Sequence, residues 1–124
     1  MKILIVDDEK DVEMLFRQKF RKEVKNNSLE LLFAFSGQEA LELLERDNPP
    51  VVMYVFSDIN MPGMTGLELL KLVKTRFPEI KVSMISAYGD AENYNKAKES
   101  GAQEFFTKPI ITKGRLKINN NRLI

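Results

Sequence analysis

The chain has 124 residues, 19 of them basic and 18 acidic, and it contains neither cysteine nor histidine. Its length suits one domain with its own core, and its balanced charge argues against direct binding to nucleic acid. The missing residue types exclude disulfides, thiol catalysis, histidine metal ligands and a phosphohistidine on this chain. Because the apolar runs are too short to span a bilayer and no secretion signal is visible, we expect a cytoplasmic protein that does not bind membranes.

Apolar runs rich in β-branched residues alternate with helical patterns along the whole chain. This alternation predicts a parallel sheet with helices on both faces. Pro49 and Pro50 end the second helical pattern, because proline lacks the backbone donor and restricts the residue before it. In chain order we expect a strand at 2–6, a helix from Val12 to about Asn26, a strand at 29–35, a helix on Ala40, Leu41 and Leu44, a strand from Val51, a helix at 67–77, a strand at 81–85, a helix at 90–100 and a strand at 104–107.

The segment after Pro109 fits this alternation least well. A fifth helix is expected there, yet Gly114 and the run Asn119-Asn120-Asn121 are poor helix formers. Leu116 and Ile118 are also spaced by two, which is not a helical period. The sequence therefore leaves residues 111–124 open between an atypical fifth helix and a tail.

Polar residues follow four of the predicted strands. Asp7 and Asp8 follow the first, Asp58 the third, Ser86 the fourth and Lys108 the fifth. In open α/β sheets, ligands bind beyond the carboxyl ends of the strands, so these residues are expected to share one pocket. Three clustered carboxylates repel each other unless a cation lies among them, which predicts a divalent metal site beside a nucleophilic aspartate. Each piece alone has a structural explanation, such as a turn or a helix cap, and only the joint order is specific.

With Met61-Pro62-Gly63 following Asp58, the chain up to about Ile110 resembles a response-regulator receiver domain of two-component signalling, similar to the chemotaxis-type regulators. The resemblance implies a doubly wound, flavodoxin-like α/β fold, a three-layer sandwich around a five-stranded parallel sheet in the order 2-1-3-4-5. It also implies that residues 1–124 form a single receiver domain. The interval from Pro50 to Asp58 is about two residues longer than this resemblance leads us to expect, which predicts a β-bulge or a shifted strand start near Tyr54.

The resemblance implies a role for each pocket residue. Asp58 matches the phosphoryl acceptor, and Asp8 matches a direct ligand of Mg²⁺ or Mn²⁺. Asp7 would act on the metal through water, and the backbone carbonyl of Asn60 would complete the protein's share of the ligands.

Four further residues match the switching parts of the family. Ser86 matches the hydroxyl that moves to the phosphoryl group, and Ala87 matches its small neighbour. Lys108 matches the lysine that pairs with the phosphoryl oxygens, and Phe105 stands where the family commonly has a switch tyrosine. Because Phe105 has no hydroxyl, it can report the switch only through packing.

The function implied is a phosphorylation-controlled signalling switch whose own chemistry is limited to phosphoryl transfer onto Asp58 and its hydrolysis. A histidine kinase or phosphotransfer protein would donate the phosphate. The partner that recognises the phosphorylated form would be an unknown effector, a missing output domain or a second copy in a homodimer. Two alternatives stay open: a small Mg²⁺-dependent phosphatase acting through an aspartyl-phosphate, disfavoured because Asn60 stands where a second general acid is needed, and a phosphorylation-independent interaction module.

Overall fold

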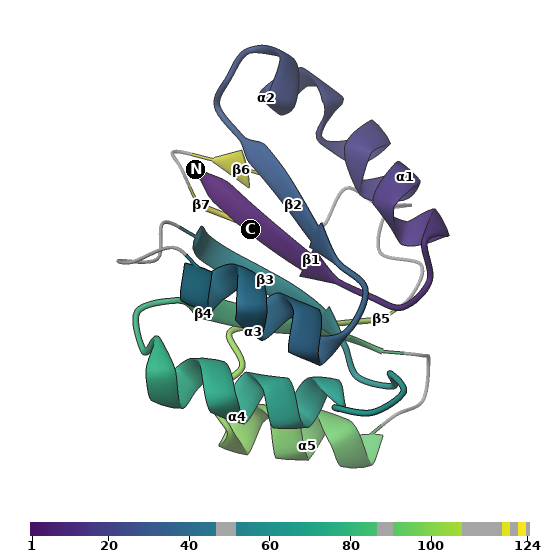
Figure 1. The fold of residues 1–124 in the computed structure, drawn as a ribbon, viewed down its shortest axis with the longest axis vertical. Helices are drawn as coiled ribbons and strands as arrows, with labels where there is room; N and C mark the ends of the chain where they lie inside the picture. The colour runs from purple at the N-terminus through teal and green to yellow at the C-terminus, as the bar shows by residue number, and fades with distance from the viewer. Residues whose placement is uncertain (47–51, 87–90, 108–117, 120–121, 124) are drawn as a thin grey trace.

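The computed structural model describes residues 1–46, 52–86, 91–107, 118–119 and 122–123. Its centre is a five-stranded parallel sheet in the order β2-β1-β3-β4-β5, with helices on both faces (Figure 1). This architecture confirms the predicted fold class and strand order. The elements are β1 (Lys2–Val6), α1 (Asp11–Lys19), α2 (Arg21–Lys25), β2 (Glu30–Ala34), α3 (Gly37–Arg46), β3 (Val52–Asp58), α4 (Gly66–Arg76), β4 (Lys81–Ser86), α5 (Ala91–Glu99), β5 (Phe105–Thr107), β6 (Ile118–Asn119) and β7 (Arg122–Leu123).

One residue of the extra length before Asp58 forms a bulge at the start of β3. Lys2 of β1 pairs with Val52, but the next residue, Ile3, pairs with Tyr54, so Met53 is an additional residue in β3. From Tyr54 onward the register is regular and ends with Val6 opposite Ser57. The predicted bulge near Tyr54 is confirmed, and it leaves the carboxyl end of the strand undisturbed.

The first predicted helix is in fact two helices, α1 and α2, so the expectation of one helix was wrong at Phe20. The backbone of Phe20 has φ −107° and ψ 23°, which is not helical. Its N–H still donates to the Phe16 carbonyl at 3.0 Å, and its carbonyl accepts from the Val24 N–H at 2.9 Å. The apolar spacing therefore continues across the break, which is why periodicity alone could not locate it.

The sheet separates two buried layers, because successive residues of a strand point to opposite faces. On the face covered by α1, the layer is rich in aromatic rings; on the face covered by α3, α4 and α5, it consists mainly of aliphatic and methionine side chains (Figure 1). We call these the aromatic layer and the aliphatic layer. The aromatic layer contains Ile3, Ile5, Phe16, Phe20, Leu29, Leu31, Tyr54, Phe56, Ile85 and Phe106, and the aliphatic layer includes Leu4, Val6, Leu41, Leu44, Val55, Met61, Leu69, Leu70, Val73, Val82 and Met84.

The C-terminal segment differs from a fifth helix where it is described. Ile118 pairs with Leu123 and Asn119 with Arg122 in a two-stranded antiparallel sheet, so of the two possibilities left open for this segment, the fifth helix does not hold for these four residues. Residues 108–117 lie outside the described part of the chain. Among the described residues, no helix combines the length and hydropathy that a membrane crossing needs.

Candidate functional site

The register of the central strands brings two aspartates together. Val6 lies opposite Ser57, so the residues that follow, Asp7 and Asp58, leave the carboxyl ends of β1 and β3 as neighbours. On the other side of β3, Asp58 itself lies opposite Ile85 of β4. The predicted meeting of separate segments at one edge of the sheet is therefore confirmed for these residues.

Three carboxylates form the centre of the site. One oxygen from each of Asp7, Asp8 and Asp58 can be chosen so that all three lie within 4.8 Å of one another. Asp7 and Asp58 are buried, whereas Asp8 is exposed. Carboxylate oxygens at this spacing repel one another unless a positive charge is shared between them. The donor set consists only of oxygens, which is the set that a hard divalent cation such as Mg²⁺ prefers, so these residues fit a metal of that kind.

Backbone contacts hold the start of the loop that follows Asp58. The Ile59 N–H donates to the Ile85 carbonyl of β4 at 3.1 Å, and the Gly66 N–H donates back to the Ile59 carbonyl at 2.8 Å. The buried Ser57 hydroxyl donates to the Asp58 carbonyl at 2.9 Å. These bonds hold the backbone of Asp58 in place through its two sequence neighbours, Ser57 and Ile59.

Gly66 is required where the loop returns to Asp58. A Cβ atom at this position would overlap the Asp58 carbonyl oxygen and lie 2.8 Å from the Ile59 Cα. Any side chain would therefore push the first turn of α4 away from the end of β3. The sequence pattern did not indicate this close approach.

A capping box begins α4 directly after the loop. The Glu68 N–H donates to the Thr65 hydroxyl at 3.2 Å, and the Thr65 N–H donates to the Glu68 carboxylate at 3.1 Å. The bond from the Thr65 backbone stabilises the charged carboxylate and lowers the pKa of Glu68 below its usual 4.5. The pattern Thr-x-x-Glu before an apolar run is a signal from which the sequence could have given this helix start.

The predicted switch residues lie in neighbouring strands, Ser86 as the last residue of β4 and Phe105 as the first residue of β5, opposite Met84. Ser86 is fully buried at the end of β4 and pairs with Thr107 of β5. Phe105 is half-buried against the aliphatic layer, and its ring meets the exposed Tyr94 ring of α5 edge to face at 5.2 Å. Phe106 points to the other face and joins the aromatic layer.

Asn60, Lys108 and Ala87 are the three other residues predicted to belong to the site. Asn60 is exposed between the buried Ile59 and Met61, in the loop directly after Asp58. Lys108 and Ala87 lie outside the described residues, so their expected roles remain predictions.

Comparison with known proteins agrees with this arrangement. Residues 3–118 match the response regulator receiver domain family. Sporulation initiation phosphotransferase F of Bacillus subtilis is 35% identical over 109 residues, which cover 88% of this chain and 82% of that protein. Response regulator protein PilR of Pseudomonas aeruginosa is 34% identical over 116 residues, 94% of this chain but only 24% of the longer relative.

A solved structure shows the same fold. A response regulator receiver domain protein from Clostridium thermocellum matches with a TM-score of 0.75 and 28% identity, covering 88% of this chain and 82% of that one. The parallel sheet order, the carboxylates at its edge and a family match over nearly the whole length agree with one another. The chain belongs to the response regulator receiver domain family of two-component signalling.

Proposed function

We propose that Asp58 accepts a phosphoryl group from a histidine kinase or phosphotransfer protein and that the phosphorylated chain presents an altered surface to a partner. The observation that carries this proposal is the convergence of Asp7, Asp8 and Asp58 at the carboxyl edge of the sheet, with oxygens within 4.8 Å. A buried nucleophile beside two further carboxylates is the arrangement that metal-assisted phosphoryl transfer needs.

The residues that would hold Mg²⁺ or Mn²⁺ are Asp8, Asp58 and the backbone carbonyl of Asn60, with Asp7 acting through water. The oxygens of the three carboxylates lie within 4.8 Å of one another, which supports their sharing one hard divalent cation. When bound, the ion supplies the positive charge that screens the acceptor and the transferred group from each other.

The transfer itself is an in-line displacement by an Asp58 carboxylate oxygen. The new O–P bond forms as the P–N bond of the donor's phosphohistidine breaks, and the departing imidazole nitrogen takes a proton from solvent. The backbone bonds around Ser57 and Ile59 hold Asp58 in place during this exchange. Lys108 would pair with the phosphoryl oxygens from the opposite side.

The response to phosphorylation would pass through Ser86 to Phe105. The added negative charge and acceptor oxygens would attract the Ser86 hydroxyl, and the space that its loop vacates would admit Phe105. Phe105 already contacts Tyr94 on α5, so its movement would change the exposed α5–β5 face. An effector, an output domain or a second copy of the chain would recognise and bind that face.

The central test is phosphate incorporation by an Asp58→Asn variant. Wild-type protein incubated with Mg²⁺ and acetyl phosphate should gain the mass of one phosphoryl group, and Asp58→Asn should gain none because the amide is not a nucleophile. Asp11→Asn, which changes an acidic residue of α1 outside the cluster, is the matched control and should be labelled like wild type. Intact-mass spectrometry reads the result, and labelling of Asp58→Asn would contradict the proposal.

The same preparation separates a switch from a phosphatase. We expect the label on Asp58 to decay by hydrolysis, while an added phosphomonoester is not turned over. Release of inorganic phosphate from that ester, measured at substrate excess and abolished by Asp58→Asn, would favour the phosphatase instead.

A further inference from the structure

Helix α3 lies unusually close to the loop that follows Asp58. Gly37, the buried first residue of α3, faces Met64 in that loop. A methyl group added at Gly37 would lie 2.8 Å from Met64 Sδ and 3.0 Å from both Met64 Cβ and Met64 Cγ. These separations are below van der Waals contact, so a side chain at residue 37 would require Met64 to shift.

The contact to Met64 Cβ is the informative one. Rotation of the side chain could move Sδ and Cγ away, but the position of Cβ is set by the backbone. A side chain at Gly37 would therefore shift the loop backbone itself, or the start of α3, by a few tenths of an ångström. The absence of a side chain at residue 37 therefore allows α3 and the loop that contains Met64 to lie this close together.

The loop transmits such a displacement toward the carboxylates because its two ends are already fixed. Ile59 is bonded to β4 at one end, and Gly66 is pressed against the Asp58 backbone at the other. Met61 is buried in the aliphatic layer between them. Asn60 stands in this short span, so movement of Met64 changes where the Asn60 carbonyl lies relative to Asp58.

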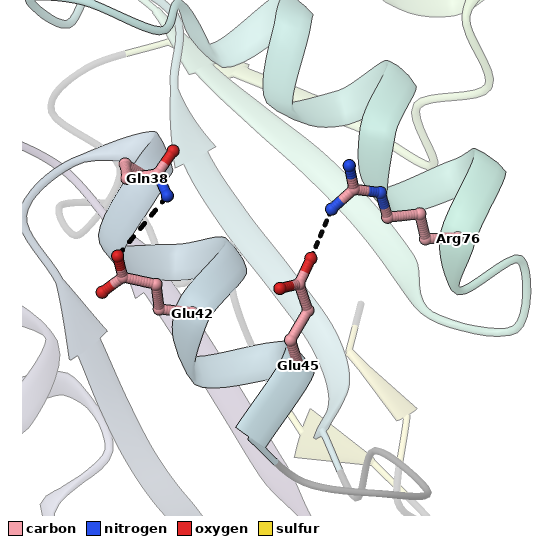
Figure 2. A network of polar contacts seen from close by, with 4 residues as sticks. All are labelled: Gln38, Glu42, Glu45 and Arg76. Atoms are coloured by element: carbon pink, nitrogen blue, oxygen red, sulfur yellow. Dashed lines mark hydrogen bonds and ion pairs between the residues drawn. The ribbon is translucent and has the colours of Figure 1, made fainter.

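Helix α3 is also held at its far end. Glu45 near the C-terminus of α3 pairs with Arg76 of α4, and Gln38 and Glu42 interact along the exposed side of the same helix (Figure 2). At the first turn, the Glu39 N–H donates to the Ser36 hydroxyl at 3.1 Å. Ala40, Leu41 and Leu44 also bury the inner face of α3 in the aliphatic layer, so a clash at Gly37 falls on the loop.

We propose that Gly37 is a positioning residue for the Asp58 site and that it acts through Met64 to set the place of the Asn60 carbonyl. This inference rests on the proposed function, because it takes that carbonyl as a metal ligand. It assigns Gly37 and Met64 no contact with the phosphoryl group.

The test is a double-mutant cycle on Mg²⁺ affinity. Gly37→Ala should weaken Mg²⁺ binding by about 10-fold, the lower end of the effect of residues that orient metal ligands. Alanine is the better helix former, so a loss of affinity would not come from a weaker α3. Adding Met64→Gly removes Cβ together with Sδ and Cγ and should restore most of the affinity, whereas Met64→Gly alone should stay near wild type.

Mg²⁺ alone is titrated into each protein while the amide resonances of Ile59 and Gly66 are followed by NMR. In a second measurement, labelling by acetyl phosphate is timed over a range of Mg²⁺ concentrations. A positioning role predicts that Gly37→Ala needs more Mg²⁺ but approaches the wild-type rate at saturation. Glu45→Gln, at the other end of α3, is the matched control and should bind Mg²⁺ like wild type.

The outcomes are distinct. Unchanged Mg²⁺ affinity in Gly37→Ala, an equal loss in Glu45→Gln, or no recovery on adding Met64→Gly would each overturn the role of Gly37 while leaving the proposed function intact. Failure of the wild-type protein itself to bind Mg²⁺ would overturn the proposed function, and the role of Gly37 with it.

Discussion

The two faces of the sheet are packed with different side chains, although the same strands supply both. On the α1 face, aromatic rings pack against one another, with Phe56 centred 5.8 Å from Phe16, 4.9 Å from Tyr54 and 5.9 Å from Phe106. On the other face, the loop after Asp58 and the half-buried Phe105 rest on aliphatic and methionine side chains. Rings have few rotatable bonds, whereas methionine adapts to its neighbours. We infer that the aromatic layer stabilises the sheet and that the aliphatic layer accommodates movement near the site.

The strongest test of this contrast is Phe56→Ala. Phe56 is fully buried at the centre of the aromatic layer, so its removal should lower the free energy of unfolding by about 3–5 kcal/mol. Phe105→Ala is the matched control, because it removes the same atoms from a half-buried position and should cost less. Urea denaturation followed by circular dichroism measures both, and equal losses would remove the distinction between the layers.

A smaller loss of stability is expected from Tyr54→Phe, which removes a polar contact within the aromatic layer. The buried Tyr54 and Ser83 hydroxyls share a hydrogen bond of 2.6 Å. Deleting the phenol oxygen leaves the Ser83 hydroxyl buried without that partner and should cost about 1–2 kcal/mol. The variant Ser83→Ala/Tyr54→Phe removes both groups and should cost less than the sum of the single changes, as measured by denaturant unfolding.

The same tyrosine has a defined pH dependence. Burial raises the pKa of Tyr54 above its ordinary 10.0. Its folded state holds the proton more tightly than the unfolded state, so this stabilisation is complete below pH 10.0 and is lost as the pH rises toward the folded pKa. The stability advantage of wild type over Tyr54→Phe should therefore be constant below that pH and shrink above it. An advantage that grows with alkaline pH would contradict the assignment.

The smallest effect is expected at the exposed start of α4, on the side of the aliphatic layer. Hydrogen bonds from Thr65 lower the pKa of Glu68, so its contribution is present above pH 4.5 and is lost as the pH falls through the folded pKa. Glu68→Gln keeps the side-chain oxygen but removes the charge. Its melting temperature should lie slightly below that of wild type near neutral pH and converge with it in acid, and a gap that persists in acid would exclude the charge as its cause.

Much of the fold could be predicted because it depends on local pattern. Strand and helix order follows from the period of the apolar residues, and Asp7, Asp8 and Asp58 could be placed at one edge because parallel strands share their direction. The bulge was also predictable, because excess residues in a strand leave the hydrogen-bonded ladder, although the bulge contains one residue where the excess was expected to be about two. The break at Phe20 was not, because the apolar spacing runs through it unchanged.

Sequence by itself thus determined which residues form the sheet and which acidic groups reach its edge, because burial on one face leaves a repeating pattern along the chain. Only the tertiary structure decided how closely segments distant in sequence approach one another. Gly37 against Met64, Gly66 against Asp58 and Tyr54 against Ser83 are set by packing between such segments. No periodic signal records these distances, since each depends on the positions of two backbones rather than on the order of residues in either.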